Sequence, residues 1–147
     1  KHHEAGTLEG ILGELGSTIL SVMKIIGFEN SSVINSDWIR AYSSPFPDRA
    51  SCKGGIEFPL DIHLQRAFEY IIEGLETGNI DVLKTKPAML AVGLKDHAIR
   101  PENQIADFKG LFPDAPINTF EQAGHFCQED IPEILVPLIH QFIQANP

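Results

Sequence analysis

A carboxylate and an imidazole each follow a segment that we interpret as a short strand in the second half of the chain. Asp96 comes after residues 87–93, and His125 comes after residues 117–120. A carboxylate that accepts a hydrogen bond from one imidazole nitrogen fixes the tautomer and stabilises the imidazolium, so that the other nitrogen is free to take a proton from water or a hydroxyl group. The pKa of an ordinary histidine is ~6.5, so the side chain can take up and release a proton near neutral pH. The two residues are therefore the candidate acid and base of a catalytic site.

The chain from residue 87 onward has a pattern that could position such a pair. Residues 87–93 form a short apolar run bounded by Pro and Gly, which is typical of a strand buried on both faces of a parallel sheet. The predicted order is a strand over 87–93, a helix from Pro101, a strand over 117–120 and a helix from near Asp130. This order implies right-handed crossovers and a parallel pair of strands, and ligands of such sheets bind beyond the carboxyl ends of the strands. We therefore expect Asp96 and His125 to meet at one edge of the sheet.

The last predicted helix carries two local features. Asp130 and Glu133 have the spacing of a capping box, which places Asp130 at the N-cap. Pro137 lies inside the helix and is expected to kink it, because proline removes one backbone donor.

The first half of the chain shows helical periodicity and no strand pattern. Apolar residues recur at helical spacing over residues 8–26, before Gly27, and over residues 64–75, before Gly78. Between them, residues 28–59 are rich in Ser, Asn, Pro and Gly, which predicts a long packed loop with one short helical turn. We expect a helical part over residues 1–80 and a strand-containing part over residues 81–147, together an α/β fold.

Composition excludes several classes of protein. The 147 residues are 43% hydrophobic and 21% charged, as in an ordinary globular domain. With 11 Lys and Arg against 20 Asp and Glu, the net charge of -9 would repel a phosphate backbone, so we expect no nucleic-acid partner.

Charged residues and glycines interrupt residues 8–26, so we expect no membrane span, and we expect no signal peptide. Cys52 and Cys127 lack a C-x-x-C spacing, which indicates a reduced, cytoplasmic setting. His2 and His3 are interpreted as part of a flexible end, so no metal site is expected.

Three segments of the chain resemble one known superfamily. Gly93-Leu-Lys-Asp96 followed by Pro101 resembles the segment that carries the acid after the seventh strand of α/β-hydrolases. Ala123-Gly-His-Phe-Cys-Gln-Glu129 resembles the histidine segment after the eighth strand. Ala41-Tyr-Ser-Ser-Pro-Phe-Pro-Asp48, followed by Gly54 or Gly55 and then by Phe58-Pro59, is similar to the cap-domain segment of haloalkane dehalogenases and related hydrolases. The resemblance implies the C-terminal part of an α/β-hydrolase fold, with residues 1–80 as a helical cap segment and residues 81–147 as the last two strands and helices of the core.

The resemblance also implies an activity. In haloalkane dehalogenases an aspartate attacks the carbon that bears the halogen, halide leaves, and water activated by the histidine hydrolyses the alkyl-enzyme ester. Asp96 and His125 match the acid and the base, the implied substrate is a small apolar haloalkane, and no cofactor is implied. The nucleophile of this fold sits in a Gly-x-nucleophile-x-Gly turn, and no such turn occurs in the chain. We therefore expect the nucleophile and the oxyanion donors on a missing N-terminal half, and the isolated chain to be inactive.

Other interpretations of the same residues stay open. Asp96 could turn the loop or cap the next helix. An epoxide or an ester could replace the haloalkane as substrate, with Tyr42 or Tyr70 as acids for an epoxide; an aspartate nucleophile indicates halide or epoxide chemistry, and a serine indicates an ester. A third alternative is a fragment without activity whose apolar strand edge over residues 89–92 pairs with another chain. A homo-oligomer, or pairing with the missing half, is therefore expected.

Several nearby residues are assigned no catalytic role. Trp38 is interpreted as a packing anchor and Cys127 as a small buried hydrophobe. Lys95 could form a weak ion pair with Asp96. The histidines interpreted as surface or core residues are His63, His97 and His140.

Overall fold

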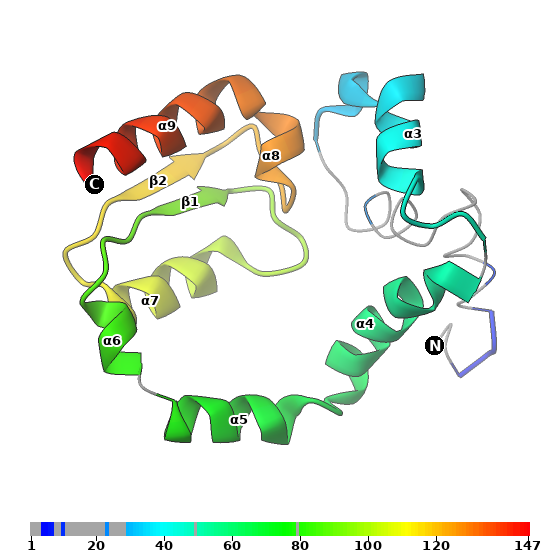
Figure 1. Ribbon diagram of the computed structural model, residues 1–147, viewed down its shortest axis with the longest axis horizontal. Coiled ribbons are helices and arrows are strands. Elements are labelled where there is room, and N and C mark those ends of the chain that lie inside the picture. The colour runs from blue at the N-terminus through cyan, green and yellow to red at the C-terminus, as the bar shows by residue number, and fades with distance from the viewer. Residues whose placement is uncertain (1–3, 8–9, 11–22, 24–28, 49, 79) are drawn as a thin grey trace. The chain divides into compact units, whose positions relative to one another are not determined.

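The computed structural model describes residues 4–7, 10, 23, 29–48, 50–78 and 80–147 (Figure 1). The chain divides into two compact units. Unit 1 comprises Lys1–Ile25 with Ile34–Asn79, and unit 2 comprises Ile26–Val33 with Ile80–Pro147. The helix predicted over residues 8–26 lies outside the described residues, apart from Gly10 and Met23.

The described part of unit 1 is mainly helical. It contains α3 (Ser36–Ser43), the 3-10 turn η2 (Ala50–Cys52), α4 (Lys53–Leu64) and α5 (Phe68–Thr77). The Asn35 side chain caps α3 by accepting hydrogen bonds from Asp37 N at 3.0 Å and Trp38 N at 2.9 Å. The cap satisfies two of the amides that lack a partner within the helix.

The prediction of a long loop over residues 28–59 is wrong. Besides α3, α4 already begins at Lys53 and continues through Gly54, Gly55 and Pro59. Glycine and proline lower helix propensity and so favoured a loop in the sequence pattern. Propensity is a weak prior, however, and tertiary contacts often override it.

A sharp turn separates α4 from α5, where the sequence predicted one helix over residues 64–75. Gln65 has φ 55° and ψ 28°, the left-handed conformation in which many helices end. The Arg66 guanidinium reaches back along α4 to Glu57 Oε2 at 2.9 Å and Asp61 Oδ1 at 3.1 Å. Gly78 is confirmed as the stop of α5, since it follows Thr77 directly as the C-cap residue.

Within the described residues, unit 2 is built on a two-stranded parallel sheet of β1 (Leu90–Gly93) and β2 (Ile117–Phe120). The register pairs Leu90 with Ile117 and Gly93 with Phe120. The helices of the unit are α6 (Ile80–Lys84), α7 (Pro101–Leu111), α8 (Cys127–Asp130) and α9 (Pro132–Ala145), and η1 (Ser31–Val33) is a 3-10 turn. Figure 1 shows the strand pair between α7 and α9. The α/β class, the strand-helix-strand-helix order and the parallel pairing are confirmed.

Local sequence explains most boundaries in unit 2. Pro101 occupies the first turn of α7 as predicted, where its missing amide hydrogen is not needed. The bounds of β2 match the prediction, whereas β1 starts at Leu90 instead of residue 87. The first ladder bond runs from Leu90 N to Pro116 O at 3.0 Å, so the pairing begins only where β2 is within reach. Among the described residues of the unit, Val92 in β1 and Ile131 before α9 are the most buried large side chains.

The last helix begins later than predicted and without the expected capping box. Asp130 ends α8, and α9 starts at Pro132 with Ile131 at the N-cap position and no side-chain cap among the described residues. The Asp130 carboxylate is buried and accepts hydrogen bonds from Asn30 N and Gly124 N instead. The prediction of a capping box is therefore wrong, because backbone amides outside the helix donate hydrogen bonds to the Asp130 carboxylate. The helix continues through Pro137, and the kink stays a prediction.

The helices are short. The longest helix of the described residues is α9, with 14 residues. Over the part of the chain that the structure describes, none has the length and apolar character that crossing a bilayer requires.

Candidate functional site

The loops that follow β1 and β2 approach each other closely. Lys95 N donates a hydrogen bond to Ala123 O at 3.0 Å. Gly93 permits this approach, because a Cβ at that position would lie 2.3 Å from Gly124 O and 2.4 Å from Ala123 O. The loops therefore lie side by side beyond the carboxyl ends of the two strands.

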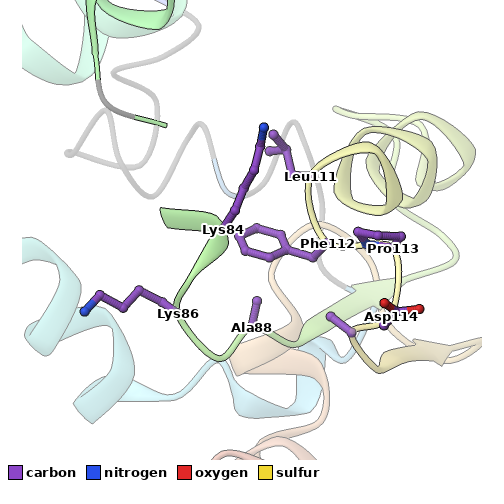
Figure 2. Close-up of a pocket in the computed structure, with 8 residues that line it drawn as sticks. Lys84, Lys86, Ala88, Leu111, Phe112, Pro113 and Asp114 are labelled. Atoms are coloured by element: carbon purple, nitrogen blue, oxygen red, sulfur yellow. The ribbon is translucent and has the colours of Figure 1, made fainter. Parts of the chain in front are cut away.

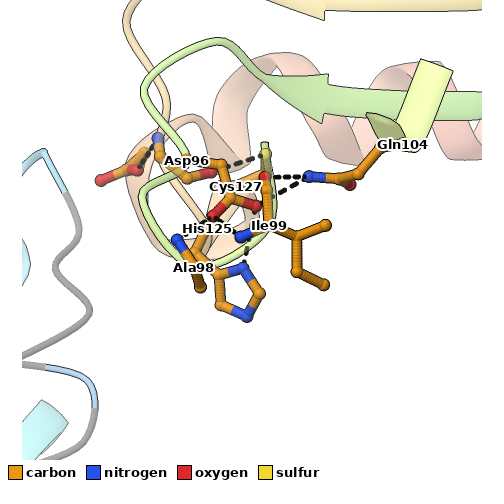
Figure 3. Close-up of polar contacts among 8 residues, drawn as sticks. Asp96, Ala98, Ile99, Gln104, His125 and Cys127 are labelled. Carbon is orange, nitrogen blue, oxygen red and sulfur yellow. Dashed lines mark hydrogen bonds and ion pairs between the residues drawn. The ribbon is translucent and has the colours of Figure 1, made fainter. Parts of the chain in front are cut away.

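Asp96 and His125 meet at this edge of the sheet (Figure 3). His125 Nδ1 lies 2.9 Å from Asp96 Oδ2. The Asp96 side chain is only 5% exposed, whereas the His125 side chain is 30% exposed and so reaches the surface. Because an ionised carboxylate can only accept hydrogen bonds, Nδ1 carries the proton, and Nε2 of the neutral ring is then available as a base. The structure thus brings together the two residues that the sequence singles out.

Three further donors surround the Asp96 carboxylate. Oδ1 accepts hydrogen bonds from Ala98 N at 2.8 Å and Ile99 N at 2.9 Å, and Oδ2 accepts one from Gln104 Nε2 at 2.8 Å. Burial alone would raise the pKa of Asp96, but the hydrogen bonds from Ile99 N, His125 and Ala98 N outweigh burial and hold that pKa below its usual value. Asp96 therefore both turns its own loop and stays ionised at neutral pH as the partner of His125.

The lowered pKa of Asp96 predicts a pH-dependent contribution to stability. A carboxylate with a lower pKa in the folded state stabilises the fold above its unfolded value of ~3.9, and this contribution is lost as pH falls through the folded value. We expect Asp96→Asn to lower the melting temperature at neutral pH, and the difference from the unaltered chain to shrink below about pH 4. Thermal unfolding followed by circular dichroism measures both, with Asp107→Asn on the exposed side of α7 as control. A difference that stays constant into strong acid would contradict this expectation.

Asp130 is a second buried carboxylate beside the site. Its Oδ2 accepts a hydrogen bond from Gly124 N at 2.7 Å and its Oδ1 accepts one from Asn30 N at 2.8 Å. Gly124 directly precedes His125, so Asp130 fixes the backbone that carries the imidazole. The sequence does not reveal this role, because Asn30 is 100 positions away and because the spacing of Asp130 to Glu133 suggests a helix cap.

Replacing Asp130 with asparagine should destabilise unit 2. The asparagine oxygen can accept from one backbone amide, but its amide group then faces the other amide donor. A buried donor left without an acceptor costs roughly 1–3 kcal/mol, so we expect a loss of about that size and a lower urea midpoint. Asp107→Asn is again the matched control, and an unchanged midpoint for Asp130→Asn would show that the two amides do not depend on the carboxylate.

The structure also places the neighbouring residues. Cys127 Sγ lies 3.3 Å from Gly124 O, and burial raises the pKa of the Cys127 thiol, to which the Asp130 carboxylate adds. A thiol of this kind is a poor nucleophile at neutral pH. Lys95 pairs with Glu29 Oε2 at 3.1 Å, so the ion pair considered with Asp96 is wrong. The exposed histidines of the described residues include His63, His97 and His140.

The tyrosines considered as acids lie in a different unit from Asp96 and His125. Tyr42 packs against Trp38 with ring centroids 4.6 Å apart, and both are half-buried, which fits a packing role for Trp38. Tyr70 is 79% exposed on α5.

A surface pocket lies at the opposite end of the strands (Figure 2). Ala88 precedes β1 and residues 112–115 precede β2, so the pocket is at the amino ends of both strands. Its volume of about 220 Å³ is below the ~300–1,000 Å³ that is usual for pockets enclosing small ligands. Its lining residues are Lys84, Lys86, Ala88, Leu111, Phe112, Pro113, Asp114 and Ala115. The pocket is therefore separate from the candidate site. Across the described residues, no group of three or more His, Cys, Asp or Glu side chains is arranged to hold a metal ion.

The chain is similar to two kinds of curated enzyme. It is 30% identical over 109 residues to cis-3-alkyl-4-alkyloxetan-2-one decarboxylase of Xanthomonas campestris. The matched region covers 74% of this chain and 36% of that protein. It is 33% identical over 102 residues to Haloalkane dehalogenase 2 of Mycobacterium tuberculosis and of Mycobacterium bovis, which covers 69% of this chain and 35% of each relative. The chain thus spans about a third of the length of these relatives. No family model matches the chain.

Proposed function

We propose that this chain is part of an α/β-hydrolase of the haloalkane dehalogenase type, with Asp96 as the acid and His125 as the base of a catalytic triad. The observation that carries the proposal is the 2.9 Å contact between His125 Nδ1 and Asp96 Oδ2 beyond the carboxyl ends of two adjacent parallel strands. The similarity to Haloalkane dehalogenase 2 over 69% of the chain supports it. We assign residues 1–80 to a helical cap segment and residues 81–147 to the C-terminal part of the core.

In this proposal the reaction has two steps. An aspartate outside these 147 residues forms a C–O bond to the carbon that bears the halogen, and halide leaves with the electrons of the broken bond. His125 Nε2 then takes a proton from water, and the hydroxide attacks the carbonyl carbon of the ester. The ester bond breaks and the alcohol leaves with the proton from the ring. Asp96 holds the Nδ1 proton and stabilises the imidazolium, and the chemistry needs neither a metal nor an organic cofactor.

The second candidate is a decarboxylase of four-membered cyclic esters. The match to the oxetan-2-one decarboxylase covers 74% of the chain and supports this candidate as well. An oxetan-2-one, like a haloalkane, has an electrophilic carbon that a carboxylate can attack. Epoxide or ester hydrolysis stays an alternative that the identity of the nucleophile would decide.

A chimera provides the test. This chain replaces the section of the Mycobacterium tuberculosis Haloalkane dehalogenase 2 that it matches, so that the dehalogenase supplies the rest of the enzyme. We expect halide release from short chloro- and bromoalkanes; release of carbon dioxide from a dialkyl oxetan-2-one without halide release would favour the second candidate. A folded chimera that forms neither product would count against both.

The tautomer of His125 tests the acid–base pair in the chain itself. If Asp96 accepts a hydrogen bond from Nδ1–H, the ring proton should stay on Nδ1. Long-range ¹H–¹⁵N spectra at about pH 8.5, where an ordinary histidine is neutral, should then show mainly the Nδ1–H form. Asp96→Asn should shift the ring towards the Nε2–H form. A ring that is protonated mainly at Nε2 in the unaltered chain would contradict the proposed pair.

We also propose that the chain self-associates or binds the remainder of its enzyme. Within the described residues β1 pairs with β2 alone, so the backbone groups of its other edge lack a partner strand. On α5, Phe68, Ile71 and Leu75 are each 53% exposed. Apolar surface and an open strand edge favour association, so we expect light scattering at micromolar concentration to detect a dimer or a larger species. A monodisperse monomer would contradict self-association.

A further inference from the structure

Gln104 reaches from the first turns of α7 to the candidate acid (Figure 3). Its Nε2 lies 2.8 Å from Asp96 Oδ2 and 2.9 Å from Ile99 O. Both partners are acceptors, so both protons of the side-chain amide are used. Turning the amide round would place its oxygen against a carboxylate and a carbonyl. The orientation of Gln104 as a donor is therefore fixed by its surroundings.

We propose that Gln104 is a positioning residue that determines which lone pair of Asp96 is left for His125. The proposal rests on the function proposed above, because it concerns the same acid–base pair. A carboxylate offers about four lone-pair directions. Oδ1 accepts from Ala98 N and Ile99 N, while Oδ2 accepts from Gln104 Nε2 and His125 Nδ1. With three directions occupied by other donors, the fourth is the one that faces the imidazole.

Gln104 differs from the other two donors in where it comes from. Ala98 and Ile99 belong to the same loop as Asp96, so a movement of that loop carries the carboxylate and these amides together. Gln104 belongs to α7, which packs against β1. It is therefore the donor that holds the carboxylate in a fixed position relative to a regular element of the core.

Loss of Gln104 should loosen the contact between Asp96 and His125. Oδ2 would then have a second open direction, which water or a rotated imidazole could use. The neutral ring would spend more time with its proton on Nε2, and in that form Nε2 cannot take a proton from water. Gln104 thus acts on catalysis through the tautomer of His125 and not through contact with substrate.

Gln104→Met tests this inference, since methionine keeps an unbranched side chain and removes the amide. Gln141→Met, at an exposed glutamine of α9, is the matched control. In the full 147-residue chain at about pH 8.5, long-range ¹H–¹⁵N spectra give the ratio of the Nδ1–H to the Nε2–H form of His125. We expect the ratio to fall about fivefold in Gln104→Met, as for the loss of one net hydrogen bond, and to stay unchanged in Gln141→Met.

The outcomes separate this inference from the proposed function. An unchanged ratio in folded Gln104→Met, together with a lowered ratio in Asp96→Asn, would overturn the role of Gln104 and leave the acid–base pair intact. A ratio that Asp96→Asn does not change would overturn the pair itself. Should Gln104→Met not fold, the unaltered chain still gives a test. Both side-chain amide protons of Gln104 should exchange with solvent more slowly than those of Gln141, and equal rates would overturn the inference.

Discussion

His125→Gln in the chimera with Haloalkane dehalogenase 2 is expected to slow turnover strongly and leave the first chemical step in place. A general base contributes about 10²–10⁴-fold to a rate, so we expect steady-state halide release to fall roughly 10³-fold. Displacement of halide by the aspartate does not need a base. A burst of about one halide per active site should therefore precede the slow phase, and mass spectrometry should detect the trapped alkyl ester.

The control for this variant is His140→Gln. His140 is an exposed histidine of α9, so its replacement changes the same residue type away from the Asp96–His125 pair. We expect halide release from this control to match that of the parent chimera. Sustained turnover by His125→Gln would show that another group activates the water.

Gly93→Ala is expected to separate the two loops that carry the acid and the base. The new Cβ would lie 2.3 Å from Gly124 O, 2.4 Å from Ala123 O and 2.6 Å from Ala123 C. All three atoms belong to the backbone, so no side-chain rotation relieves the overlap. Overpacking of this kind costs about 1–3 kcal/mol or more, which for a chain of this size corresponds to a melting temperature lower by roughly 5–10 °C. The Nδ1–H form of His125 should also decline, because the 2.9 Å contact with Asp96 depends on the loop spacing.

Gly110→Ala, near the end of α7, is the matched control. A Cβ at Gly110 meets no atom within 4 Å beyond the neighbouring residues and backbone of its own helix, and alanine is the better helix former. We therefore expect stability to stay the same or rise by about 0.5 kcal/mol. Melting temperatures from calorimetry compare the two variants directly. A Gly93→Ala chain with the same melting temperature as the unaltered protein would show that the loops can accommodate a side chain.

The elements of unit 2 could be predicted because their determinants are local. Pro101 at a helix start, the apolar run around residue 90 and the short segment 117–120 after Pro116 are visible in the sequence itself. The parallel pairing followed from the order of those elements. Since parallel strands end at the same edge, the proximity of Asp96 and His125 was also within reach of the sequence, although the role of each residue is still a proposal.

The residues that hold the acid–base pair in place could not be predicted, because their roles depend on contacts between distant residues. Nothing local distinguishes Gln104 from the other polar residues of α7. Asp130 has the spacing of a helix cap, yet its carboxylate is bound by Asn30 N and Gly124 N. A local pattern cannot show that a partner 100 positions away will be present.

The prediction of one helix over residues 64–75 was wrong for a different reason, which lies at the end of α4. A left-handed residue at a helix end is usually glycine or asparagine, and Gln65 gives no such indication. The ion pairs from Arg66 to Glu57 and Asp61 stand beside this turn, and they form only once the turn has brought Arg66 back along the helix.

The hydrogen bond from Asn30 N to Asp130 Oδ1 makes the helical stretch of residues 34–79 an insertion within unit 2, because the chain leaves unit 2 after residue 33 and rejoins it at residue 80. The entropy lost on closing such an excursion grows only with the logarithm of its length, by about 0.6 kcal/mol for each doubling. The inserted helices can therefore gain or lose turns at little thermodynamic penalty to the sheet. Shortening or lengthening them should leave the loops that carry Asp96 and His125 as they are.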